Sequence, residues 1–216
     1  MLHTFRNARE PFSSYSHFIG AVLAGVGLAA MLLHGWLRGA SAQTLLSVSL
    51  FCLSLVALYA ASSYYHFSLC KESMLRILKK LDHSMIYVLI AGSYTPILLK
   101  FMEQPKATYF TAGVWLIAVL GIAIKLLWID APRLLGTLLY LLLGWAIAFD
   151  FQVVLSMPPA AIVLLAAGGL SYTIGGIIYI VKRPNLSPGF GFHELFHLFV
   201  LAGSVCHYWM VFFFVI

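Results

Sequence analysis

The stretch from Thr44 to Phe67 reads TLLSVSLFCLSLVALYAASSYYHF and contains no Asp, Glu, Lys or Arg. A helix rises 1.5 Å per residue, so about 20 mostly apolar residues cross the hydrocarbon core of a bilayer. The stretch is long enough for this, and its apolar residues run continuously instead of alternating with polar ones. It therefore predicts a helix that crosses a membrane.

The composition of the whole chain points the same way. Of its 216 residues, 62% are hydrophobic and only 9% are charged, whereas a soluble domain has about 25% charged residues. This excludes a water-soluble single domain. Membranes admit helical bundles and closed β-barrels, and the chain lacks the period-two alternation of barrel strands. We predict an all-α integral membrane protein.

Apolar runs separated by short polar or Pro/Gly segments predict seven spans, at 17–37, 44–67, 82–100, 109–128, 134–154, 160–181 and 193–216. The prediction is a short N-terminal segment, 1–16, followed by a seven-helix transmembrane domain, 17–216. Asp150, near the end of the fifth span, is expected at the membrane interface. Small residues four apart, Gly25 with Ala29 and Ser171 with Gly175, predict close helix contacts.

The distribution of basic residues predicts the orientation. If the N-terminus is cytoplasmic, ten of the 13 Lys and Arg residues lie on the cytoplasmic side, and only Arg38, Lys100 and Lys106 lie outside. Short cytoplasmic loops are enriched in basic residues. We therefore expect a cytoplasmic N-terminus and an external C-terminus.

The same bias accounts for the net charge of +6 without a nucleic-acid partner. The three cysteines, Cys52, Cys70 and Cys206, are an odd number without paired spacing. They predict free thiols, with neither a disulfide framework nor a cysteine-based zinc site.

Ionisable residues gather at the predicted cytoplasmic ends of three spans. His66 ends the second span, Asp82 opens the third, and His193 and His197 open the seventh. An ionisable side chain at membrane depth costs at least a few kcal/mol and usually marks function. Agreement in depth across three helices therefore indicates a site.

The spacing of these residues favours a metal site. His193 and His197 are four apart, so they share a helix face and can bind one ion. His66 could supply a third nitrogen, which leaves a fourth position for water as in catalytic zinc sites. Asp82 could hold that water or a histidine ring, and Ser62 lies one turn before His66. Three imidazoles suit zinc better than calcium or magnesium.

The other histidines have simpler interpretations. We expect His17, His34 and His207 to be hydrogen-bonded packing residues, and His207 lies about 15 Å beyond His197 along the helix. His83 is expected beside the site or at the interface.

The run His193-Glu-Leu-Phe-His197 also fits the H-E-x-x-H pattern of metalloproteases, in which the Glu is a general base. A further ligand in the spacing of those enzymes is not evident in the sequence. We interpret Glu194 instead as an acid favoured by the helix dipole.

At these residues the sequence resembles the hemolysin III family, the bacterial branch of the progestin and adipoQ receptor group. The shared marks are S-x-x-x-H (Ser62, His66), Leu81-Asp82, AGSYTP at 91–96, and H-x-x-x-H (His193, His197). The resemblance runs from about Ser16 to the end. It implies a multi-pass protein of the bacterial plasma membrane, with a cytoplasmic N-terminus and seven helices. It also implies one zinc ion near the cytoplasmic face, held by His66, His193 and His197, with Asp82 and Ser62 beside it.

Receptor relatives in that group resemble hydrolases that cleave the amide of ceramide-like lipids. Our leading hypothesis is a zinc-dependent hydrolase of an amide or ester in a lipid-derived substrate. Asp82 would orient the water or accept its proton, and Ser62 would donate a hydrogen bond near the developing oxyanion.

Two alternatives stay open, both with a structural zinc: a membrane-lytic, pore-forming protein and a lipid-ligand sensor. The expected partners are the bilayer and a lipid-like small molecule, and the sequence does not predict the oligomeric state.

Overall fold

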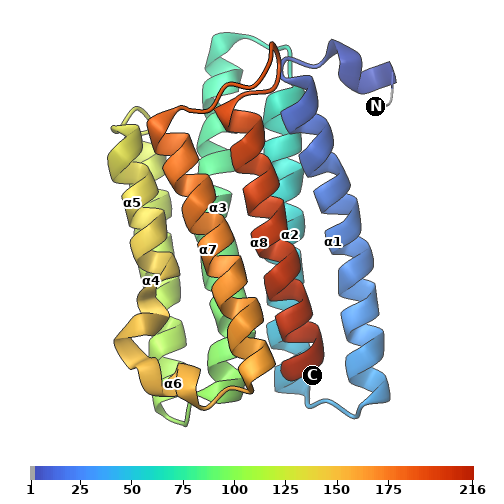
Figure 1. Ribbon diagram of the computed structural model, residues 1–216, viewed down its shortest axis with the longest axis vertical. Helices are drawn as coiled ribbons and strands as arrows, with labels where there is room; N and C mark the ends of the chain where they lie inside the picture. Colours follow the sequence, from blue (N-terminus) through green and yellow to red (C-terminus); the bar gives the residue numbers. More distant parts are fainter. Residues whose placement is uncertain (1–2) are drawn as a thin grey trace.

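The computed structural model describes residues 3–216, and in that range the chain is helical, without β-strands. The elements are η1 (His3–Asn7), α1 (Pro11–Leu37), α2 (Ala42–Phe67), α3 (Glu72–Phe101), α4 (Lys106–Leu127), α5 (Arg133–Gly144), η2 (Ala146–Asp150), α6 (Phe151–Leu155), α7 (Pro159–Val181) and α8 (Phe192–Phe214). Seven helical segments are long and apolar enough to cross a membrane, counting 133–155 as one. The helices run side by side, with the chain termini at opposite ends of the bundle (Figure 1). This confirms the predicted seven-helix architecture.

Two helices begin well before their predicted spans. α1 starts at Pro11 and α3 starts at Glu72, where the apolar runs predicted 17 and 82. Proline at the first helical position suits the start of α1, because its fixed φ matches a helix and its missing N–H is not needed there. The added turns of both helices carry polar or charged side chains. Hydropathy therefore detects the part of a helix that suits lipid and misses its polar extension.

The predicted fifth span is broken in the structure. α5 ends at Gly144, and a short 3-10 helix, η2, separates it from α6. The Tyr94 hydroxyl of α3 bridges the break, donating to the Gly144 carbonyl (2.8 Å) and accepting from the Ile147 N–H (2.9 Å). Irregular backbone at membrane depth needs such protein partners. Asp150 closes η2, where it is buried and paired with Lys106.

The close helix contacts are made by glycines, only partly at the predicted positions. Gly25 is exposed, and a Cβ added there would meet nothing within 4 Å, so that part of the prediction is wrong. A Cβ at Gly20 would lie 2.8 Å from Leu201 of α8. Gly175 does pack tightly as predicted, since a Cβ there would lie 2.9 Å from the Cβ of Phe199. Gly20 is on the inward face of α1, and Gly25 faces outward.

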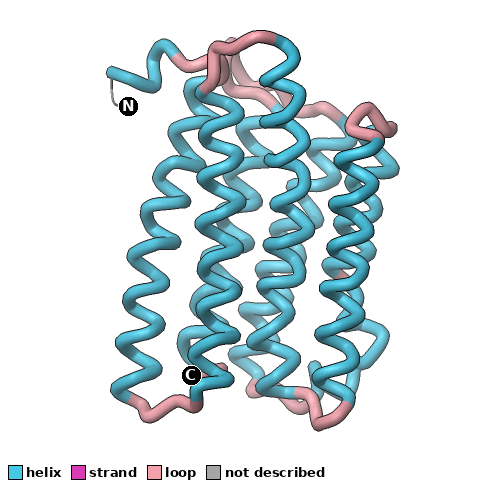
Figure 2. The backbone as a smooth tube through the Cα atoms, turned by 180° about the vertical axis from the view of Figure 1, so that it is seen from behind, coloured by secondary structure: helices cyan, strands magenta, loops and turns pink. Residues whose placement is uncertain are grey.

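α1 packs against α2 and α8, α2 against α3, and α7 against α8. Seen from behind, nearly all of the backbone is helical, and short loops gather at the two ends of the bundle (Figure 2). The three cysteines are free, as predicted. The order of packing brings the last turn of α2 and the first turns of α8 to the same end of the molecule.

Candidate metal centre

Three histidines from α2 and α8 meet at the end of the bundle where the chain begins. His66 lies in the last turn of α2, and His193 and His197 lie in the first two turns of α8. One ring nitrogen of each lies within 4.8 Å of the others. His66 and His197 are almost completely buried, whereas His193 is partly accessible. The three side chains could therefore hold one metal ion.

The orientation of the rings fits this use. Nδ1 of His66 lies 2.8 Å from the Glu10 carboxylate, which can only accept, so Nδ1 carries the proton. In the neutral ring Nε2 then has a free lone pair, and it lies 3.4 Å from Nε2 of His193. Nδ1 of His197 is buried and has no hydrogen-bond partner among residues 3–216. Imidazole nitrogens arranged this way suit zinc, which prefers nitrogen and sulfur ligands.

Glu10 is a site residue that the sequence analysis missed. Besides its bond to His66, its carboxylate lies 3.8 Å from Nε2 of His193 and 3.1 Å from Arg9. Burial acts to raise the pKa of Glu10, but the hydrogen bond from His66 and the charges of His66, His193 and Arg9 outweigh it and lower the pKa to about 2. A carboxylate behind a ligating histidine fixes the ring and strengthens its binding. Glu10 precedes the predicted first span, so the search for apolar runs excluded it.

His17 of α1 is a second residue whose setting was not predicted. Its ring stacks on the ring of His197, with centroids 3.8 Å apart and planes at 12°. It is buried, yet neither of its ring nitrogens has a partner in the described part of the chain. It is a packing residue, as expected, but without the expected hydrogen bond. The stack holds His197 in place. Glu10 is the residue immediately before α1, seven residues ahead of His17, and this spacing of about two helical turns could have linked them.

Asp82 and Ser62 lie beside the histidines. Ser62 is one turn before His66 on α2, Asp82 is the first residue of the predicted third span and lies within α3, and both are more than nine-tenths buried. Both side chains line a cavity that also reaches His193 and His197. Asp82 is within electrostatic range of His66 and lies next to the Ser62 hydroxyl. The fold thus brings together all five residues that the sequence selected.

Glu194 performs a local task at the start of α8. Its carboxylate accepts a hydrogen bond from the Gly191 N–H (2.8 Å) and another from the Ser13 hydroxyl (3.2 Å). Both oxygens are therefore engaged in capping α8 and joining it to α1, which agrees with its interpretation as a helix-start acid. His83 lines the cavity, and His34 stacks on an aromatic ring of α8 as a packing residue.

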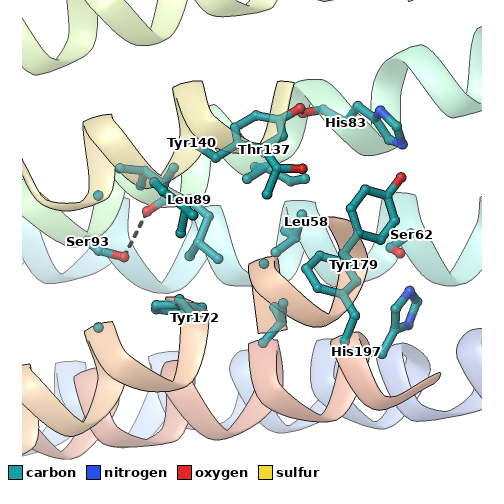
Figure 3. Close-up of a pocket in the computed structure, with 18 of the residues that line it drawn as sticks. Leu58, Ser62, His83, Leu89, Ser93, Thr137, Tyr140, Tyr172, Tyr179 and His197 are labelled. Atoms are coloured by element: carbon teal, nitrogen blue, oxygen red, sulfur yellow. Dashed lines mark hydrogen bonds between the residues drawn. The ribbon is translucent and has the colours of Figure 1, made fainter. Parts of the chain in front are cut away.

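A cavity of about 160 Å³ extends from the histidines into the bundle. This is roughly ten times the space that one water molecule needs. Its walls are mostly apolar, and they include Leu58, Ile86, Leu89, Ile90, Leu141, Trp145, Phe196 and Val200. In Figure 3, Ser62 and His197 lie at one side of the cavity, and Ser93 and Tyr172 lie toward the opposite side. The cavity can take an apolar chain whose end reaches the histidines.

Comparison with known proteins places the chain in a family. The family model described as "Haemolysin-III related" matches residues 5–208. The "Hemolysin-3 homolog" of Bacillus subtilis (strain 168) is 33% identical over 211 residues, which cover 97% of this chain and 96% of that protein. The "Hemolysin-3" of Bacillus cereus is 30% identical over 208 residues, covering 96% and 92%.

A more distant relative belongs to the progestin and adipoQ receptor group. The "Monocyte to macrophage differentiation factor" of Homo sapiens is 30% identical over 164 residues, covering 74% of this chain and 66% of that protein. Both the family model and the bacterial relatives span nearly the whole seven-helix bundle. The chain therefore belongs to the hemolysin III family.

Proposed function

We propose that the chain is a zinc-dependent membrane hydrolase that cleaves an amide or ester bond in a lipid-derived substrate. One observation carries this proposal: three imidazoles converge, and two of them, His193 and His197, line a mostly apolar cavity whose wall also presents Asp82 and Ser62. Pockets that bind apolar ligands are lined in this way, with a few polar groups that fix orientation. A lipid chain would lie in the cavity, and its amide or ester would reach the polar end.

The residues divide the chemistry among them. Zinc held by His66, His193 and His197 would supply a Lewis acid that polarises a carbonyl and lowers the pKa of water. The Asp82 carboxylate accepts the proton of the attacking water, as a general base. The Ser62 hydroxyl donates a hydrogen bond to the oxygen that gains charge. The apolar wall binds the acyl chain and keeps bulk water away from it.

We also propose that this chemistry takes place near the cytoplasmic face of the plasma membrane, with residues 1–16 cytoplasmic and 17–216 forming the transmembrane domain. Ten of the 13 basic residues belong to segments at the end of the bundle that carries the histidines. The rule for basic residues in short loops supports a cytoplasmic position for that end.

The first test measures the metal. Protein purified in detergent without added metal should contain roughly one zinc ion per chain by inductively coupled plasma mass spectrometry, as expected for one tetrahedral site. The variant His193→Ala/His197→Ala should lose it. A folded, monodisperse wild type without metal would overturn the proposal.

The second test separates the metal from the chemistry. Asp82→Asn should lower turnover of lipid amides or esters by about a hundredfold or more, because general-base catalysis contributes that much, and its zinc content should not change. Asp130→Asn removes the same charge from an exposed residue and should leave turnover unaffected. Full activity in Asp82→Asn would contradict the role given to Asp82.

The printed name of the Bacillus cereus relative, "Hemolysin-3", supports membrane lysis as a second candidate function. Lysis by the protein alone should release dye from protein-free liposomes, and replacing His193 and His197 should not prevent it. Dye release that required these histidines would instead connect lysis to the hydrolytic site.

A further inference from the structure

Tyr179 is a cavity residue to which the proposed chemistry gives no role. It lies in the last turn of α7 and lines the cavity together with Ser62 and His193. In Figure 3 its ring lies on the same side of the cavity as Ser62 and His197, and its hydroxyl points away from α7 toward His83. A phenol hydroxyl can donate a hydrogen bond as well as accept one. The side chain therefore brings a hydrogen-bond donor to the polar end of the cavity.

The Tyr179 hydroxyl is free to bind a ligand. The backbone carbonyl of Tyr179 accepts a hydrogen bond from Arg133 (3.1 Å), but its hydroxyl forms none within residues 3–216. The fully enclosed polar atoms that lack a partner in this range belong to other side chains, such as Tyr87. The unbonded Tyr179 hydroxyl therefore keeps accessible surface, on a partly accessible residue of the cavity wall. A ligand in the cavity can reach this donor.

The nearby hydroxyls on α5 are engaged within the protein. Tyr140 donates to the His83 carbonyl (3.0 Å), and Thr137 donates to the Arg133 carbonyl (2.9 Å). Both residues line the same cavity, but their protons already have acceptors. Tyr179 differs from them because its O–H remains available to a ligand.

Packing holds the Tyr179 ring in place. The centroid of the Phe196 ring lies 4.9 Å from that of Tyr179, and the His193 ring centroid lies 6.0 Å away. From α5, the guanidinium carbon of Arg133 lies 4.4 Å from the centroid of the Tyr179 ring. A cation over an aromatic face attracts the electrons of the ring, which strengthens the phenol O–H as a donor. Donors that are fixed before the reaction are the ones that stabilise a developing negative charge.

Tyr179 is also close to the groups assigned to the reaction. It lies within electrostatic range of Asp82, and Asp82 lies next to the Ser62 hydroxyl. The helices α2, α3 and α7 thus each place one oxygen-bearing side chain at the polar end of the cavity. A developing oxyanion is commonly stabilised by more than one donor. Ser62 and Tyr179 can supply two, from opposite walls.

We propose that Tyr179 is a catalytic residue whose hydroxyl donates, together with Ser62, to the substrate oxygen that becomes negatively charged. Water attacks the carbonyl carbon, its proton passes to Asp82, and the π electrons of the C=O bond move onto this oxygen. Both hydroxyls keep their protons. When the electron pair returns, the bond to the leaving nitrogen or oxygen breaks, and Asp82 gives the leaving group its proton. This inference rests on the proposed hydrolase function and adds a residue to its site.

Tyr179→Phe tests this role, because it removes only the hydroxyl and keeps the ring contacts. It should lower kcat for a lipid amide or ester by about a hundredfold, the effect of one oxyanion donor, while KM, zinc content and thermal stability stay near those of the wild type. Tyr64→Phe removes a hydroxyl from an exposed tyrosine in the last turns of α2 and should have no effect. Full kcat in Tyr179→Phe would overturn the proposal. A loss of zinc or of stability that accounted for the lower activity would overturn it too.

Two zinc-binding ligands give a measurement that does not depend on turnover. Dodecanohydroxamic acid presents an anionic oxygen, whereas 1-dodecanethiol presents only sulfur, which is a weak acceptor. Isothermal titration of zinc-loaded protein in detergent should show that Tyr179→Phe binds the hydroxamate about tenfold more weakly and the thiol equally well, as expected for one hydrogen bond to a charged group. An unchanged hydroxamate affinity would overturn the proposal, as would an equal loss for both ligands.

The two measurements keep this inference separate from the proposed function. A wild type whose hydroxamate affinity depends on Tyr179, yet which cleaves no lipid amide or ester, would overturn the hydrolase function and leave Tyr179 as an oxygen-binding residue. Turnover that is lost in Asp82→Asn but unchanged in Tyr179→Phe would overturn this inference alone.

Discussion

Replacing Glu10 by Gln should weaken metal binding without removing a ligand. Glu10 accepts the hydrogen bond from Nδ1 of His66 (2.8 Å) and lies 3.8 Å from Nε2 of His193. Glutamine keeps an acceptor oxygen at this position, so the His66 ring keeps its orientation. The substitution removes only the negative charge that attracts a bound cation.

The size of the effect follows from the geometry. Loss of a carboxylate behind a ligating histidine costs about tenfold to a hundredfold in metal affinity. The Glu10 side chain is 36% exposed, so solvent screens part of its charge, and we expect the lower limit, about tenfold or about 1.4 kcal/mol. Glu10→Ala, which also removes the hydrogen bond, should approach a hundredfold.

A competition titration with a zinc-binding dye measures these affinities on purified protein. Glu72→Gln is the matched control, because Glu72 is an exposed acid at the start of α3 and should leave the affinity unchanged. Zinc affinity in Glu10→Gln within twofold of the wild type would refute the positioning role of Glu10. An equal loss in both variants would refute it too, since that would reflect net charge alone.

Three further predictions concern stability, measured by thermal unfolding in detergent. Gly121→Ala should destabilise the bundle by about 1–3 kcal/mol, because its Cβ would collide with a tyrosine ring of α3; Gly113→Ala in the same helix meets nothing within 4 Å and should be neutral or slightly stabilising. Tyr94→Phe leaves two backbone groups at the α5 break without their partner and should cost about 1–3 kcal/mol, while Tyr109→Phe, at an exposed position, should cost nothing measurable. Zinc at a hundred times its dissociation constant should stabilise the wild type by about 2.7 kcal/mol, and a chelator should reverse this; His193→Ala should show neither change.

The sequence predicted the seven helices and the convergence of the histidines for identifiable reasons. Lipid admits helical bundles and closed β-barrels, and long apolar runs without the period-two alternation of barrel strands select the helices. His193 and His197 share a face because helical periodicity requires it. His66 could be added because short loops return alternate helix ends to the same side. These inferences need only local geometry and the direction of the chain.

Other features depend on packing that no local pattern reveals. The break after Gly144 lies within an apolar run, and Tyr94, which stabilises it, is some fifty residues away. The cavity was also not predicted, because apolar residues that line a cavity have the same character as those that face lipid. His207 shows the consequence: its distance from His197 along α8 could be predicted, whereas its place in the same cavity could not.

The inward face of α1 explains how a helix without a predicted ligand organises the candidate site. The Ser14 hydroxyl donates to the backbone carbonyl of Ser63 in α2 (3.0 Å), and the Ser63 hydroxyl donates to the backbone carbonyl of Ser14 (2.9 Å). These two hydrogen bonds set the register of α1 and α2. In that register Glu10 reaches His66, and His17 stacks on His197. One face of α1 therefore contacts both helices that supply the histidines. Because an ion bound by side chains of two helices depends on their relative position, α1 is as much a part of the site as the ligands it supports.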